Sequence, residues 1–128
     1  MTATDILQVS TATETCEAAT ELARSAVQAG LAASAQIHGP AISVFWHEGV
    51  FGSSEEWLLL LKTTTARYDE LEAHLIERHP WRNSEVTAIP LSAGAAPYLD
   101  WIRLTTSASA KANDTSTSGG GAVQEPAD

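Results

Sequence analysis

Residues 42–65 carry two different hydrophobic patterns, and the rest of the chain is organised around them. In the first half, apolar and polar residues alternate, which is typical of a strand with one face in water. In the second half, residues 57–61 (WLLLL) are apolar without a break, which predicts a strand covered on both faces. Helices of the same chain can cover one face of a single sheet. We expect a second subunit to cover the other, so the pattern predicts an oligomer.

Small and polar residues between these two halves indicate where the chain reverses. Gly49 and Gly52 bracket Val50 and Phe51, and residues 53–56 (SSEE) carry no strand signal. We therefore expect the reversal within this stretch, with three glutamates around a solvated tip. They are Glu48, Glu55 and Glu56.

Periodic stretches on either side of this hairpin predict the remaining elements. Thr11 and Glu14 have the spacing of a helix capping box, Gly30 suits the end of that helix, and Pro80 the end of the next. In order, we expect a strand at residues 6–9, a helix ending near 30, an apolar strand at 31–37 with a bend at 38–40, the hairpin, a helix at 65–79, a strand at 86–91 and a short helix at 98–104. The order βαββαβα is that of an α+β, ferredoxin-like split βαβ sandwich, with antiparallel strands and the main helices on one face.

The composition changes after Thr105. The residues that follow are mainly Ser, Thr, Ala and Gly, and no periodic apolar pattern continues. We expect one folded domain over residues 1–106 and a disordered, low-complexity tail over residues 107–128.

The net charge narrows the range of partners. A formal charge of −9 argues against nucleic acid or an anionic membrane surface, because both require a cationic face. One cysteine, Cys16, cannot form an internal disulfide, and no apolar stretch approaches the length of a membrane span. We expect a soluble, cytoplasmic protein.

Candidate chemistry is sparse. No nucleophile elbow, glycine-rich phosphate loop or paired-carboxylate pattern occurs, so we expect no enzymatic activity. Cys16 falls on the apolar stripe of the first helix, where a buried thiol is expected. No spacing typical of a metal site occurs, and His79 beside Pro80 is the best single candidate. Because a lone imidazole rarely holds a metal, a structural role for His79 is the favoured interpretation.

Six segments, in this order along the chain, resemble the CutA family of divalent-cation tolerance proteins. They are LARSAVQAGLAASAQI, VFWHEGVF, EEWLLLLKTT, the HP pair after the second helix, AIPLSAG and YLDWI. The resemblance spans residues 6–104. It implies a ferredoxin-like subunit assembled as a tight homotrimer, with a role in the response to metal ions.

The resemblance also implies positions for copper ligands. The family pattern places a cysteine at the end of the first strand and a His-His pair before the HP proline. Here those positions hold Ser10, Arg78 and His79, and a second-strand cysteine is replaced by Ser34. A serine hydroxyl is a poor ligand for copper and an arginine is none. We therefore expect weak copper binding, with His79 as the remaining ligand.

Clefts between subunits are the default place for a small-molecule pocket in such an assembly. Our candidates for a cleft are Trp46, Glu48, Lys62, Trp81 and Glu85. They support an alternative function, in which the chain is a trimeric signalling or scaffold module similar to the PII proteins. Such a module would bind a small molecule or a protein partner at the clefts.

Overall fold

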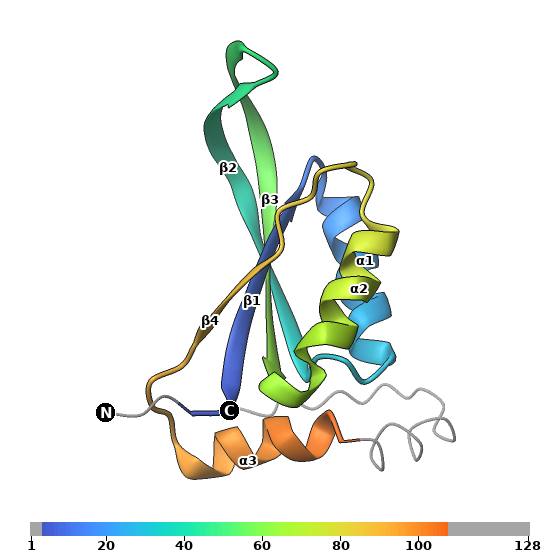
Figure 1. Ribbon diagram of the computed structural model, residues 1–128. Coiled ribbons are helices and arrows are strands. Elements are labelled where there is room, and N and C mark those ends of the chain that lie inside the picture. The colour runs from blue at the N-terminus through green and yellow to red at the C-terminus, as the bar shows by residue number, and fades with distance from the viewer. Residues whose placement is uncertain (1–3, 108–128) are drawn as a thin grey trace.

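The computed structural model, which describes residues 4–107, contains one antiparallel sheet of four strands in the order β2-β3-β1-β4 (Figure 1). The elements are β1 (Ile6–Thr13), α1 (Cys16–Gln28), β2 (Ser34–His47), β3 (Val50–Thr64), a 3₁₀ turn (Thr65–Arg67), α2 (Tyr68–Arg78), β4 (Thr87–Pro90) and α3 (Ala96–Thr105). This confirms the ferredoxin-like α+β plan, with β4 and its Pro90 at an edge of the sheet. No helix in residues 4–107 is long and apolar enough to span a membrane.

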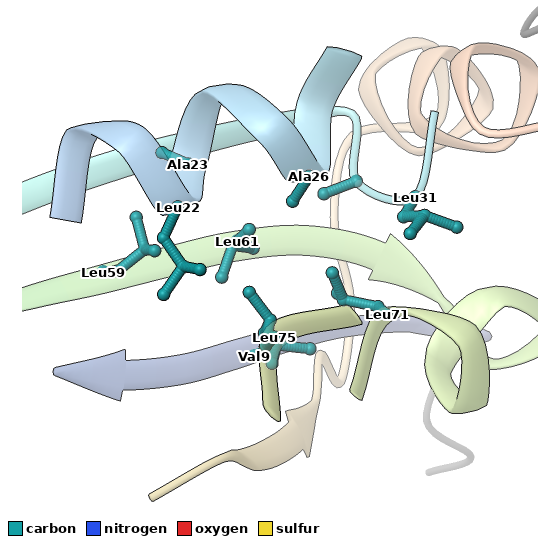
Figure 2. Close-up of a cluster of buried hydrophobic side chains, with 10 residues drawn as sticks. Val9, Leu22, Ala23, Ala26, Leu31, Leu59, Leu61, Leu71 and Leu75 are labelled. Carbon is teal, nitrogen blue, oxygen red and sulfur yellow. The ribbon is translucent and has the colours of Figure 1, made fainter. Parts of the chain in front are cut away.

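Helices α1 and α2 lie side by side on one face of the sheet and enclose the main core (Figure 2). Leu59 and Leu61 of β3 point into this core and are fully buried. The small buried residues of α1, Ala19, Ala23 and Ala26, allow close packing on the sheet. The buried members of the core are Val9, Leu22, Ala23, Ala26, Leu31, Ala32, Leu59, Leu61, Leu71 and Leu75.

The start of α1 differs from the prediction. Strand β1 continues to Thr13, and Thr11 pairs with Leu59 inside the sheet, so Thr11 is not available as a helix cap. The cap is Thr15, whose hydroxyl accepts a 3.0 Å hydrogen bond from the backbone N–H of Ala18. The predicted end at Gly30 is confirmed, because this glycine has φ +77° just after the helix.

A hydrogen bond joins the two helices on the sheet. The Oγ of Ser25 in α1 donates to the carbonyl of Leu22, so the Nε2–H of His74 in α2 donates to that same Oγ at 2.9 Å. Burial lowers the pKa of His74 below its ordinary value of 6.5, and the nearby Arg78 adds to this effect. His74 is therefore held as a neutral ring between the helices.

The chain reversal between β2 and β3 is tighter than predicted. Glu48 and Gly49 form a two-residue turn in which both have positive φ, 53° and 81°, as in a type I′ turn. Strand β3 therefore begins at Val50, and Glu55 and Glu56 lie within it rather than at the tip. Polar residues fit this part of the strand because it extends beyond the helices into solvent (Figure 1).

We call residues 41–56 the arm. It begins after an irregularity in the pairing of β2 with β3 between His38 and Ala41, which confirms the predicted bend. Gly39 lies within that bend against the ring of Trp57, where an added Cβ would come within 2.7 Å of the indole. Large apolar side chains on the arm are 60–72% exposed. They are Ile42, Val44, Trp46, Val50 and Phe51.

The sheet face opposite α1 and α2 is covered only at one end. Helix α3 lies at that end (Figure 1), and its Leu99 and Ile102 cluster with Ile6 and Ala33. In β3, Leu58 alternates with the buried Leu59 and is 39% exposed. The predicted burial of both faces is thus only partly achieved within one chain.

Candidate functional site

A groove of about 850 Å³ lies between the arm and the loop that joins α2 to β4. The arm contributes aromatic, serine and acidic side chains, and the loop contributes residues 80–83 and Glu85. Glu14, which lies between β1 and α1, completes the lining. The full lining is Glu14, Ser43, Phe45, Trp46, His47, Glu48, Ser54, Glu56, Pro80, Trp81, Arg82, Asn83 and Glu85.

The loop wall of the groove starts where α2 is forced to end. His79 has an extended conformation, φ −72° and ψ 139°, because the residue before a proline is disfavoured in the helical region. Pro80 then turns the chain towards the arm, and Trp81 and Arg82 follow on the groove wall. The sequence pair HP therefore determines where this wall begins.

Two hydrogen bonds of His79 fasten this wall to the sheet. Its Nε2 lies 2.8 Å from the carbonyl oxygen of Ala12, and its Nδ1 lies 3.1 Å from the backbone nitrogen of Trp81. A carbonyl only accepts and a backbone N–H only donates. The ring is therefore the neutral tautomer with its proton on Nε2, and both nitrogens are engaged.

The carbonyl that His79 binds lies beyond the end of a short strand. Strand β4 pairs with β1 only from Leu7 to Ser10, so Ala12 is two residues past the last pair. No residue of β4 pairs with Ala12. The buried ring of His79, a residue that is 8% exposed, donates the hydrogen bond to the carbonyl of Ala12 instead. The indole of Trp81 packs beside the ring at a centroid distance of 5.2 Å.

The residues at the expected copper positions do not form a metal site. His79 has no free nitrogen lone pair, and Arg78 is a cation in the last turn of α2. Ser10 pairs with Leu60 on the sheet face away from α2, and a hydroxyl is a poor copper ligand. Within residues 4–107, no group of three His, Cys, Asp or Glu side chains is arranged to hold a metal ion.

The groove is predominantly acidic. Four glutamates line it, whereas Arg82 is its one lining residue with a permanent positive charge. The side chain of His47 lies 3.7 Å from Glu48, and both are largely exposed. In the described part of the chain, Glu14, Glu56 and Glu85 form no ion pair or side-chain hydrogen bond. The groove therefore presents unneutralised carboxylates beside aromatic rings.

Four of the five predicted cleft residues line this one groove: Trp46, Glu48, Trp81 and Glu85. The fifth, Lys62, lies elsewhere, in β3 between Gln8 and Ser34.

Sequence reasoning missed several other lining residues, among them Phe45, Arg82 and Glu14. Ser43, Phe45 and His47 alternate along β2 and therefore share one side of the strand, and all three line the groove. Of the missed residues, Phe45 is thus the one that the sequence pattern could have indicated.

Comparison with known proteins places the chain in a family. The family model described as CutA1 divalent ion tolerance protein matches residues 7–105. The chain belongs to this family. A relative in Thermus thermophilus, named divalent-cation tolerance protein CutA, is 34% identical over 87 residues, covering 68% of this chain and 84% of that protein. A chloroplastic CutA 1 protein of Oryza sativa is 36% identical over 90 residues, and this chain spans only 51% of its length.

Solved structures of CutA proteins have the same fold as this chain. The Thermus thermophilus protein superposes with a TM-score of 0.77 at 31% identity, covering 80% of this chain and 99% of that one. The Oryza sativa CutA1 structure gives a TM-score of 0.79 at 31% identity, covering 84% of this chain and 99% of that one. The sheet and its helices are thus those of the CutA family.

Proposed function

We propose that the chain acts as a non-enzymatic, cytoplasmic homotrimer in the response to divalent cations. The main support for an oligomer is the apolar surface that a single subunit exposes. The arm presents Val44, Trp46 and Phe51 to solvent, and Leu58 is open on the uncovered sheet face. Isolated soluble subunits rarely expose such contiguous apolar surface. The number three rests on the resemblance to the CutA family.

The trimer is tested by light scattering at micromolar concentration. We expect the mass of three chains for the native protein and a smaller mass for Val44→Asp, because this charge would have to be desolvated at the interface. Ile76→Asp is the matched control, since Ile76 is also exposed but lies on α2. A well-folded native protein with the mass of one chain would refute the proposal.

For copper, we propose weak binding without a dedicated site. Its support is the arrangement at His79, where coordination at either nitrogen requires the loss of a hydrogen bond. Calorimetric titration with copper should therefore give no stoichiometric, high-affinity step. Such a step, if it disappears in His79→Ala, would show that the ring does act as a ligand.

A second candidate function is ligand binding at a cleft, by a module similar to the PII proteins. The groove favours it, because its volume falls within the range of about 300–1,000 Å³ that is usual for small-molecule sites. Aromatic and charged side chains from the arm and the α2–β4 loop meet there. The two functions are compatible within one trimer.

A further inference from the structure

We propose that the groove binds a small organic cation with an apolar body, such as an alkylated or aromatic ammonium compound. This inference rests on the second candidate function, ligand binding, and names the class of ligand. It is carried by three features of the groove: its charge, its aromatic lining, and the way in which its loop wall is fixed.

The charge selects the sign of the ligand. Four glutamates face the groove against one arginine. An anionic ligand would have to approach these carboxylates, whereas a cation can interact with Glu14, Glu56 and Glu85 without displacing an existing partner. The chain as a whole carries a formal charge of −9, which also attracts cations to its surface.

The spacing of the carboxylates argues against a bare metal ion. Glu14, Glu56 and Glu85 come from three different segments, and no three acidic or metal-ligating side chains in residues 4–107 converge on one point. A divalent cation requires several oxygen ligands at about 2.0–2.6 Å. A bulky organic cation does not, because its charge is delocalised or shielded and interacts over longer distances.

The aromatic lining suits the body of such a ligand. Trp81 lines the loop wall and is half-buried, so part of its indole remains open to the groove. Phe45 lies on the facing arm, on the same side of β2 as Ser43 and His47. Weakly hydrated cations bind the faces of aromatic rings, and tryptophan binds them best. Carboxylates beside such rings favour alkylated ammonium groups over neutral apolar molecules.

One wall of the groove is held in place before any ligand binds. The buried ring of His79 bonds both the sheet at Ala12 and the loop at Trp81, and its ring packs against the Trp81 indole. The wall that carries Trp81 is therefore anchored to β1. Preorganisation of this kind lowers the entropic cost of binding.

The test uses the full-length protein and benzyltrimethylammonium chloride in calorimetric titration at low salt. Benzyl alcohol and benzoate serve as neutral and anionic control probes. We expect saturable binding of the cation alone, weakened about three- to fivefold or more by Trp81→Leu. The double variant Glu56→Gln/Glu85→Gln should weaken it similarly. Glu17→Gln/Glu21→Gln, on the exposed side of α1, removes the same charge and should leave the affinity unchanged.

Several results would overturn the inference. They are absence of saturation at millimolar concentration, equal weakening by the α1 double variant, or no effect of Trp81→Leu. Binding of a lysine-rich peptide without binding of the small cation would also overturn it, in favour of a protein partner. Light scattering on the same samples separates the proposals. Failed binding refutes the ligand proposal whether the sample has the mass of three chains or of one. The mass of a single chain refutes the trimer and leaves the ligand proposal to the titration.

Discussion

The replacement His79→Ala tests the role of the ring most directly. In the native chain the ring joins the carbonyl of Ala12 to the backbone N–H of Trp81. The substitution removes both bonds and leaves a space where an 8%-exposed ring was packed. The carbonyl of Ala12 then has no donor from this side chain, and the loop after α2 loses its attachment to β1.

The size of the effect follows from the burial of the two groups. A buried polar group left without a partner costs about 1–3 kcal/mol. Ala12 is almost fully buried, whereas Trp81 is half-buried and water can replace part of its lost bond. Together with the lost packing, we expect the free energy of unfolding to fall by about 2–4 kcal/mol. The urea midpoint should move by about 1–2 M.

The assay is urea unfolding at one fixed protein concentration, because the stability of an oligomer depends on concentration. His38→Ala is the matched control, since His38 is exposed on β2 and should change the free energy by less than about 0.5 kcal/mol. His79→Gln should recover part of the loss, because its amide nitrogen can donate to Ala12. If His79→Ala is as stable as His38→Ala, the two hydrogen bonds do not fasten the loop and the reasoning is refuted.

Two further predictions concern the core and pH. Leu61→Ala should lower the free energy of unfolding by about 2–5 kcal/mol, because Leu61 is fully buried between the sheet and the helices; a loss below 1 kcal/mol would place it outside the core. Because the pKa of His74 is lowered in the folded protein, the unfolded chain takes up a proton first as the pH falls below about 6.5. Stability should therefore decrease from pH 7 to pH 5, and the decrease ends below the folded pKa. His74→Gln should show a smaller decrease in the same unfolding titrations, and identical slopes would contradict the burial of this ring.

The order of elements could be predicted because each one carries its own local signal. The unbroken run around Leu59 indicated a strand covered on both faces, Gly30 the end of α1, and Pro80 the end of α2. Residues 31–33, predicted as the start of a strand, precede β2, which begins at Ser34. Two other wrong boundaries arose where polar residues occur in strands. Thr11 sits in the buried part of β1, and Glu55 lies on an arm surrounded by solvent. The alternation of apolar and polar residues does not place either residue in a strand. Both are in strands because they pair with a neighbouring strand, Thr11 with Leu59 and Glu55 with Ile42.

The candidate site was only partly predictable for a different reason. The tryptophans and glutamates of the groove stood out by type, and the HP pair located one wall. The role of His79 depends on the shortness of β4, which leaves the carbonyl of Ala12 beyond the last paired residue. No local pattern in the sequence reveals how far a distant edge strand extends. The sequence therefore identified the right residue and could not show that both its nitrogens are occupied.

Strand β2 lies at an edge of the sheet, and along its fourteen residues it is hydrogen-bonded only to β3. A single subunit therefore presents a long row of unpaired backbone N–H and C=O groups, with which another extended polypeptide could pair. Its surplus of negative charge keeps identical copies apart at low ionic strength and lets them approach once salt screens the repulsion. In the proposed trimer, salt would therefore speed the encounter of subunits and with it the covering of this edge.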